Sequence, residues 1–285
     1  MSCSGVPSGP LETRCTALQG RCAHNAYAFN IRCVGIAPAA RSDGVNRLAT
    51  GGRHIHIVDA IDIRCTFMIL TVGAIKGGVG KSLLAANIAV VLAQRGRDVL
   101  LVDGDEQGSA ATFAQIRDKA TFTTVQLHGA AIRQQMRALA EKYSEIVIDV
   151  GGRDSGGLRA ALTVADMVLI PFQPRSVDLW AAGQIAALVA EARHVNERLR
   201  AYALINLADP QDSDNADAHE ALAGTEGIEA LPFMVVRRKA YPNAFSNGLS
   251  VLEPARKDPR AAHEILSLVD ALYAQQADND YQDTL

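Results

Sequence analysis

Two lysines, three glycines and a serine are clustered in the segment Lys76-Gly77-Gly78-Val79-Gly80-Lys81-Ser82. Glycines let backbone N–H groups approach phosphate oxygens closely, and a helix that begins after them adds a favourable dipole. A lysine followed by a serine supplies a cation for the β- and γ-phosphates and a hydroxyl ligand for Mg²⁺. The segment therefore predicts a phosphate-binding loop in which Lys81 contacts phosphate and Ser82 ligates Mg²⁺.

The loop departs from the strict phosphate-loop pattern at its first position. The pattern G-x-x-x-x-G-K-[ST] requires glycine at position 75, where this chain has Ile75 followed by Lys76. The form K-G-G-x-G-K-[ST] is the deviant Walker A signature. The alternative interpretation is a glycine-rich turn with two solvated lysines, but a strand pattern before the segment and a helical pattern after it favour the phosphate loop.

Carboxylates follow two apolar strand patterns. Asp103 and Asp105 come directly after one apolar run, and Asp149 lies near the end of the next, Glu145–Val150. Hard cations such as Mg²⁺ take oxygen ligands. We therefore expect the three carboxylates to lie beside the phosphate loop and to handle Mg²⁺ and water, with Asp149 in the Walker B position. The alternative is that these acids cap the helices that follow the strands.

Short apolar runs alternate with helical patterns from residue 68 onward. The runs predict strands over Met68–Ala74, Asp98–Val102, Glu145–Val150, Met167–Ile170 and Ala203–Asn206. Helices are predicted over Ser82–Arg95, Ala130–Lys142, Val177–Val195 and Ala261–Ala274. Such alternation is typical of βαβ units, whose right-handed crossovers place helices on both faces of a sheet. The sequence therefore predicts an α/β fold with a single doubly wound, mostly parallel sheet that binds ligands at the carboxyl ends of its strands.

The composition of the whole chain excludes some classes of protein. The 285 residues are 48% hydrophobic and 21% charged, with a net charge of −3. General disorder is excluded by this composition, and an integral membrane protein is excluded because no run of about 20 apolar residues occurs. The slightly acidic balance argues against a uniformly basic nucleic-acid coat but is compatible with a local basic patch.

The first 67 residues differ from the remainder. They contain all five cysteines, seven arginines and no lysine, and they show little periodicity. The cysteine spacings fit no zinc pattern, and a redox or metal-binding leader is the functional alternative. We expect residues 1–67 to be a disordered extension or the product of a mis-assigned start. Residues 68–275 are then the folded domain and 276–285 an acidic, flexible tail. The cysteine-free remainder fits a reducing cytoplasm.

In their order and spacing these motifs resemble the ParA/MinD family of deviant Walker A ATPases, and most of all its small members that partition plasmids and chromosomes. The resemblance spans about residues 68–275. It rests on KGGVGKS (76–82), VDGDEQ (102–107), VIDVGG (147–152), ADMVLIPFQPRSVDLWAAG (165–183) and RRKAYPNAFSNGLSVLE (237–253). The resemblance implies a P-loop NTPase fold with ATP and Mg²⁺ as cofactors. Glu106 stands where the second motif commonly has proline.

The resemblance also implies roles for matching residues. Lys76 corresponds to the signature lysine that reaches the partner's phosphates in a homodimer with ATP sandwiched between its subunits, and Asp105 corresponds to the carboxylate that positions the attacking water. The implied catalytic residues are Lys76, Lys81 and Asp105, the nucleotide-binding residues are 76–82 with Asn206, and the Mg²⁺ residues are Ser82, Asp103 and Asp149. Trp180 is expected in the core or a dimer interface, and Arg153 and Asp154 in a loop ion pair or against a second subunit.

The function that the resemblance implies is slow, partner-stimulated ATP hydrolysis by a cytoplasmic, nucleoid-associated protein. The ATP-bound dimer would bind DNA non-specifically and segregate plasmid or chromosomal DNA with a ParB-like adaptor. A membrane partner is not expected, because the C-terminal tail is acidic. The candidate DNA-binding residues are Arg237, Arg238, Lys239, Arg256, Lys257 and Arg260, for which the alternative is a solvated basic surface.

Two other functions remain open from the sequence. The same ATPase cycle could position a protein cargo, such as a microcompartment or a receptor cluster. Alternatively, the chain could be a nucleotide-dependent scaffold with little turnover.

Overall fold

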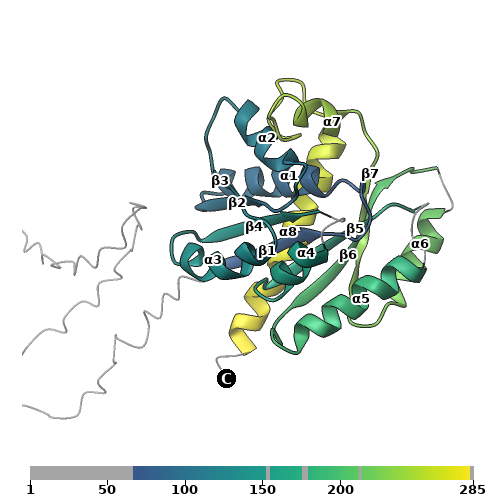
Figure 1. Ribbon diagram of the computed structural model, residues 1–285. Coiled ribbons are helices and arrows are strands. Elements are labelled where there is room, and N and C mark those ends of the chain that lie inside the picture. Colours follow the sequence, from purple (N-terminus) through teal and green to yellow (C-terminus); the bar gives the residue numbers. More distant parts are fainter. Residues whose placement is uncertain (1–66, 152–154, 175–178, 212–213, 283–285) are drawn as a thin grey trace, which may run out of the picture. The chain divides into compact units, whose positions relative to one another are not determined.

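The structure is a computed structural model that describes residues 67–151, 155–174, 179–211 and 214–282. It contains a seven-stranded sheet with the strand order β3-β2-β4-β1-β5-β6-β7 (Figure 1). The strands are β1 (Met68–Gly73), β2 (Val99–Asp103), β3 (Thr123–Gln126), β4 (Glu145–Val150), β5 (Met167–Phe172), β6 (Arg200–Ala208) and β7 (Glu229–Val236). Each pair of neighbouring strands is parallel, which confirms the predicted α/β fold.

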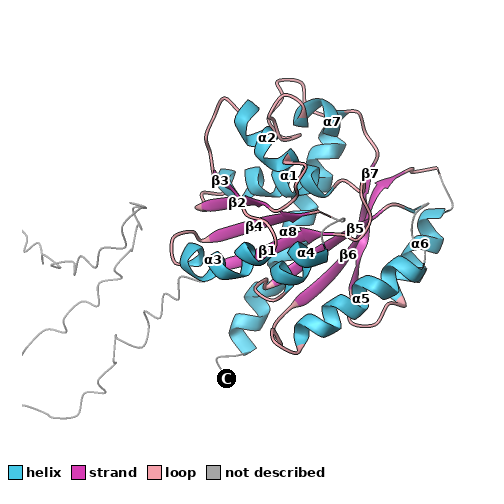
Figure 2. Cartoon of the chain, in the orientation of Figure 1, coloured by secondary structure: helices cyan, strands magenta, loops and turns pink. Residues whose placement is uncertain are grey.

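Helices cover both faces of the sheet (Figures 1 and 2). They are α1 (Lys81–Gln94), α2 (Ser109–Ile116), α3 (Ala130–Ala140), α4 (Ser155–Leu162), α5 (Leu179–Arg193), α6 (Asp214–Ala223), α7 (Ala240–Phe245) and α8 (Pro259–Gln282). The apolar side chains of α1, α2, α7 and α8 pack on one face, and those of α3, α4, α5 and α6 pack on the other. The doubly wound arrangement is therefore confirmed.

The central strands are apolar along most of their length because both of their faces are buried. In β4, the side chains of Ile146, Ile148 and Val150 join the core on the α3 and α4 side, and Val147 joins the core on the α1 side. Alternate residues of a strand point to opposite faces, so a strand between two helical layers needs apolar residues at nearly every position. This explains why the central strands read as continuous apolar runs.

The register of the central strands determines where the polar residues gather. Asp103 at the end of β2 lies opposite Asp149 on β4, and Asp149 in turn lies opposite Val72 near the end of β1. The phosphate-loop segment follows β1 directly. Three loops from separate parts of the chain therefore begin side by side at the carboxyl ends of the strands.

Several short elements are not evident from the sequence patterns. These elements are α2, β3, α4, α6, β7 and α7. The two strands among them lie at the edges of the sheet, where part of each strand is exposed to solvent. An edge strand is not covered on all sides, so its sequence lacks the continuous apolar run that identifies a central strand.

The predicted end of the last helix is wrong. Helix α8 does not end at Ala274 but continues to Gln282. The extension contains three Gln and one Ala, which favour helix, and it continues a helix that is already anchored in the core. None of the helices in the described ranges is both long and apolar enough to cross a membrane.

One buried acid lies at the amino ends of the strands, away from these loops. Glu145, the first residue of β4, is 2% exposed and accepts a hydrogen bond from the Tyr273 hydroxyl at 3.1 Å. Burial raises the pKa of Glu145 from the ordinary 4.5 to about 7, although Arg97 at 3.6 Å and the Tyr273 hydroxyl both act to lower it. The carboxylate therefore resists ionisation in the folded chain.

We predict that Glu145→Gln gains stability relative to the natural chain as the pH rises. Between pH 4.5 and 7 the folded natural chain keeps the proton on Glu145, whereas the unfolded chain has lost it, because folding raises this pKa. The unfolding free energy of the natural chain therefore falls as the pH rises from 4.5 to 7. The amide does not titrate, so the difference in unfolding free energy should grow by up to about 3 kcal/mol between pH 5 and pH 8. Urea unfolding across this range measures the difference, and Glu191→Gln, at an exposed ion pair, should show no such trend.

Candidate nucleotide-binding site

The phosphate-loop segment forms a tight turn between β1 and α1. Gly78 and Gly80 have φ values of +76° and +85°, which residues with a Cβ atom rarely adopt. Helix α1 begins at Lys81, and its N-cap residue, Gly80, has no side chain that could cap the first N–H groups. The first turn of a helix has unsatisfied N–H donors and the positive end of the helix dipole. The segment therefore presents backbone donors of the kind that bind phosphate oxygens.

Two side chains, one on β6 and one just after β5, hold this loop in place. The Asn206 Nδ2 group donates to the carbonyl oxygen of Val79 at 2.7 Å, and the Gln173 Nε2 group donates to that of Gly78 at 2.8 Å. A Cβ atom at Gly80 would lie 2.5 Å from Asn206 Nδ2, so the loop and this side chain need a glycine between them. Gln173 was not identified from the sequence, where only its place just after an apolar run could have indicated it.

Asn206 was expected to contact the nucleotide, and the structure places it directly against the phosphate loop. Its side-chain oxygen is buried and has no hydrogen-bond partner in the described part of the chain. The next residue, Leu207, has a φ of +58°, and the pairing of β6 with β7 is irregular at this point. A residue with a side chain held in this region stores about 1–3 kcal/mol of strain, which is common near functional sites.

Lys81 and Asp149, both buried, form the centre of the site together with the partly exposed Ser82. Lys81 is 6% exposed, and Asp149 is fully buried. Burial raises the pKa of Asp149 to about 7, with a further increase from the negative charge of Asp103, while the Ser82 hydroxyl and the Lys81 charge act to lower it. Although Ser82 lies close, neither carboxylate oxygen of Asp149 accepts a hydrogen bond of normal geometry from a described residue. A desolvated carboxylate without donors is a suitable partner for a cation.

The donor set fits Mg²⁺ better than a metal that requires an all-protein site. No group of three or more His, Cys, Asp or Glu side chains converges on one point among the residues that the structure describes. Mg²⁺ is commonly held by one or two protein oxygens together with water and substrate phosphates. The Ser82 hydroxyl and the Asp149 carboxylate are arranged to provide such oxygens.

Asp103 has a different set of contacts. Its two carboxylate oxygens accept backbone N–H groups, from Ala111 in the first turn of α2 at 2.7 Å and from Asp105 at 3.1 Å. Burial raises the pKa of Asp103, and the two N–H donors act in the opposite direction. These contacts agree with the alternative interpretation that an acid holds the start of the following helix. Any effect of Asp103 on Mg²⁺ would then be indirect.

Asp105 lies at the junction of two loops. Its Oδ1 atom accepts the N–H of Gln107 at 3.0 Å, and its carboxylate rests against Gly151, where a Cβ atom would come within 2.6 Å of Oδ2. The N–H of Gly104 donates to the carbonyl oxygen of Asp149 at 2.7 Å, which joins the loops after β2 and β4. A partly exposed carboxylate in this position can orient a water molecule.

The remaining predicted residues lie outside this centre or outside the described ranges. Lys76 is exposed at the start of the loop. Among the basic candidates, Arg237, Lys239, Arg256, Lys257 and Arg260 are exposed. Arg238 instead forms an ion pair with Glu264 of α8 at 2.8 Å. Arg153, Asp154 and the Trp180 side chain, like the N-terminal segment 1–66, lie outside the part that the structure describes.

Comparisons with known proteins show which proteins the chain is similar to. A family model described as the CobQ/CobB/MinD/ParA nucleotide binding domain matches residues 70–251. The chain is 31% identical over 201 residues to Maintenance of carboxysome distribution protein A of Halothiobacillus neapolitanus, which covers 69% of this chain and 92% of that protein. It is 26% identical to the chromosome-partitioning ATPase Soj of Thermus thermophilus, over 70% of this chain and 93% of that one.

A solved structure of a similar protein supports the fold. The ATP complex of a McdA variant from Cyanothece superposes with a TM-score of 0.61 and 15% sequence identity, over 72% of this chain and 96% of that chain. At this level of identity the likeness concerns the fold of the chain and not its ligands.

We predict opposite stability effects for two aspartates at neighbouring strand ends. Asp149→Asn removes a desolvated charge that lacks donors, so the nucleotide-free chain should gain about 1–3 kcal/mol at pH 8. Asp103→Asn leaves one of two backbone N–H groups without an acceptor, so that variant should lose about 1–2 kcal/mol. Urea unfolding in EDTA measures both changes.

The same pair of variants also separates ligand binding from folding. Asp149→Asn should gain much less stability than the natural chain when ATP and Mg²⁺ are added, because the neutral amide binds the cation more weakly than the charged carboxylate. If Asp149→Asn destabilised the nucleotide-free chain as Asp103→Asn does, the buried carboxylate would have a structural role instead.

Proposed function

The chain belongs to the CobQ/CobB/MinD/ParA nucleotide-binding domain family, and from this premise we propose that it positions a protein-built cargo on DNA through a cycle of ATP binding and hydrolysis. Membership of the family makes it a ParA/MinD-type nucleotide-binding ATPase. The observation that carries the choice of cargo is the 31% identity to a carboxysome distribution protein over 92% of its length. Identity to the chromosome-partitioning relative is lower, at 26%.

The phosphate loop binds the nucleotide in this proposal. The backbone N–H groups at the start of α1 and the Lys81 ammonium donate to phosphate oxygens, and the Asn206 and Gln173 side chains keep the loop in its binding shape. The Ser82 hydroxyl and the Asp149 carboxylate hold Mg²⁺. When bound, Mg²⁺ offsets the negative charge of the transferring phosphoryl group.

Asp105 is the residue that orients the attacking water. Its carboxylate is held beside Gly151, next to the strand end that carries Asp149. Catalysis of this kind depends on position and electrostatics, because the transferring group needs little covalent help from the protein. Hydrolysis is slow until Lys76 of a second copy reaches the phosphates, and the exposure of this side chain supports that role. ATP binding would therefore be linked to dimerisation.

The basic residues near α7 and α8 form the proposed DNA-binding surface. Glu264 of α8 accepts hydrogen bonds from the side chains of Arg238 and Tyr241, and the Tyr241 hydroxyl also contacts the carbonyl oxygen of Ala261. These contacts bring the start of α7 and the start of α8 together. The exposed side chains of Arg237, Lys239, Arg256, Lys257 and Arg260 flank them. Arg238 then supports the surface and does not contact phosphate itself.

A second candidate function uses the same cycle to segregate plasmid or chromosomal DNA with a ParB-like adaptor. The similarity to the partitioning ATPase Soj favours it. In either case an adaptor protein would stimulate hydrolysis and link the ATPase to its cargo.

We predict that the full chain binds duplex DNA without sequence preference when ATP and Mg²⁺ are present, and only weakly with ADP. The affinity should fall steeply with salt, because binding releases counterions from phosphates. Replacing both Arg237 and Lys239 by Ala should weaken binding by about tenfold or more. The slope of log affinity against log salt concentration should become shallower by about 1 for each basic side chain removed.

The control for this experiment is the double variant Arg133→Ala/Arg137→Ala. These two arginines are exposed on α3, which covers the other face of the sheet. The control should keep the wild-type affinity and salt dependence. Equal losses in both double variants would mean that net charge matters and that no defined surface exists.

The identity of the cargo is tested by deleting the gene for this protein in its host. We expect protein bodies to cluster or be distributed unevenly between daughter cells, while plasmids and chromosomes are inherited normally. An increase in plasmid loss or in DNA-free cells, with protein bodies unaffected, would support the partition function instead.

A further inference from the structure

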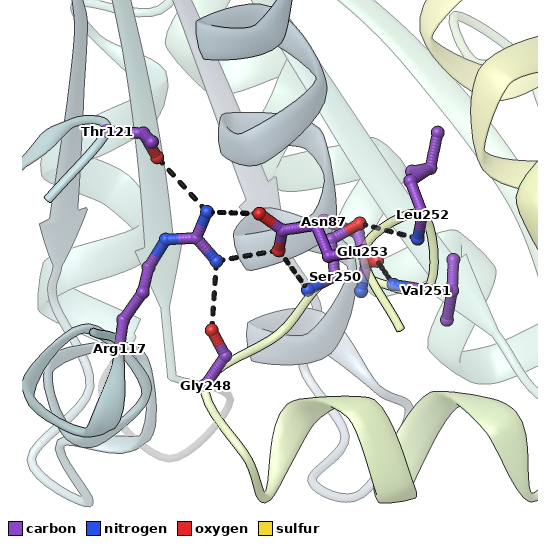
Figure 3. A network of polar contacts seen from close by, with 8 residues as sticks. All are labelled: Asn87, Arg117, Thr121, Gly248, Ser250, Val251, Leu252 and Glu253. Atoms are coloured by element: carbon purple, nitrogen blue, oxygen red, sulfur yellow. Dashed lines mark hydrogen bonds and ion pairs between the residues drawn. The ribbon is translucent and has the colours of Figure 1, made fainter. Parts of the chain in front are cut away.

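Arg117, directly after α2, is held by a network that joins distant parts of the chain (Figure 3). Its side chain is 4% exposed, and its two terminal nitrogens donate to both carboxylate oxygens of Glu253, at 2.6 and 2.7 Å. One of them also donates to the carbonyl oxygen of Gly248 at 2.9 Å. The rings of Phe113 and Phe122 lie 5.9 and 5.5 Å from the guanidinium carbon. A buried bidentate pair allows one geometry, so it fixes the end of α2 against the turn 248–253.

The backbone of this turn is packed directly against α2. Gly248 has a φ of +65°, and a Cβ atom there would lie 2.8 Å from the backbone nitrogen of Arg117. The ring of Phe245 at the end of α7 stacks on that of Phe113 in α2, with their centroids 4.9 Å apart. Helix α2 and the turn therefore have little freedom to move separately.

The same turn is also bound to α1. The Asn87 side chain is buried, and its oxygen accepts the N–H of Val251 at 3.0 Å while its nitrogen donates to the carbonyl oxygen of Leu83 at 2.8 Å. Glu253 accepts the N–H of Ser250 at 2.8 Å, so the acid that binds Arg117 also shapes the turn (Figure 3). One turn thus contacts both helices that begin at the nucleotide site.

Helix α2 connects this network to the candidate water-orienting loop. The helix has 8 residues, and the Asp103 carboxylate holds the N–H of Ala111 in its first turn. The loop with Asp105 precedes it, and Arg117 follows it. A short helix fixed at both ends moves as one body, so a displacement of the Asp105 loop reaches the turn 248–253.

The turn lies between the two halves of the basic set. Arg237 and Lys239 precede α7, and Arg256 and Lys257 follow the turn; all four side chains are exposed. A shift of the turn would change how these two pairs are placed relative to each other. Affinity for the regularly spaced phosphates of a duplex depends on that placement.

We propose that Arg117 and Glu253 are a positioning pair that couples the nucleotide site to the basic residues on either side of the turn 248–253. The coupling to DNA rests on the function proposed above. Nucleotide-dependent movement of the Asp105 loop is transmitted by α2 and the ion pair to the turn. Because coupling between two binding sites is reciprocal, DNA on the basic residues also changes the affinity for nucleotide.

The test uses the full chain and the variant Glu253→Gln, which keeps the size of the side chain and removes its charge. Duplex DNA affinity is measured with ATP and with ADP, each with Mg²⁺. The natural chain should bind DNA at least about tenfold more tightly with ATP, and the variant should show a ratio below about threefold. Nucleotide affinity itself should stay within about threefold, since Glu253 does not touch the phosphate loop.

A matched control separates this role from a loss of stability. Leu272→Ala truncates a fully buried residue of α8 that has no part in the network. It should lower the unfolding temperature and keep the ATP-to-ADP ratio in DNA affinity. A wild-type ratio in Glu253→Gln, or an equal loss of the ratio in Leu272→Ala, would overturn the proposal.

Amide hydrogen exchange of residues 244–253 tests the coupling without DNA. In the natural chain, exchange in this segment should differ between the ATP and ADP states, and Glu253→Gln should abolish the difference. If both nucleotides bind and the natural chain shows no difference, the coupling is overturned. If the difference is present but no DNA binds, the coupling holds and the DNA part of the proposed function fails.

Discussion

The alignment of β1, β2 and β4 at their carboxyl ends is the constraint on which the rest of the site depends. Asp103 and Asp149 are register partners, and Val72, just ahead of the phosphate loop, is a partner of Asp149. The loops after these strands therefore begin at one point although they are far apart in the sequence. A shift of one residue in β4 would turn the Asp149 side chain to the other face of the sheet, because strand residues alternate in direction. The apolar side chains on both faces of β4 oppose such a shift.

The two buried acids of the site, Asp103 and Asp149, differ in their hydrogen-bond partners. The charge of Asp103 is balanced by two backbone N–H donors, so this residue organises the start of α2. The charge of Asp149 has no donor of normal geometry within the described chain, and burial keeps its pKa near 7. A cation close to Asp149 would stabilise a carboxylate that the fold leaves poorly compensated. The first acid therefore contributes to structure, and the second is available for ligand binding at a cost in stability.

The sequence was sufficient to predict those parts of the fold whose structure depends on residues close together in the chain. The central strands and the phosphate loop were predicted because continuous apolar runs and a glycine-lysine pattern are compatible with few structures. Contacts between distant residues could not be predicted in this way. Gln173 holds the phosphate loop, and Arg238 pairs with Glu264, because the fold brings them together and not because of any local pattern. The helical end of α8 was missed because its acidic residues suggested a solvated tail, whereas a helix anchored in the core continues easily into such a sequence.

The strand order also has a consequence for how the chain acquires its shape during synthesis. Among the strands in the described residues, β1 is the first to be made, but its two neighbours are β4 and β5, with Met68 paired to Glu145 and Leu70 to Met167. The phosphate loop that follows β1 therefore cannot reach its final environment until more than half of the domain has left the ribosome. Sheets with such long-range pairing fold slowly, and their apolar strands stay exposed until the pairing strands have been made. A nascent chain that has reached β2 and β3 would hold the glycine-rich segment without the strands that shape it, so nucleotide can assist only the last steps of folding.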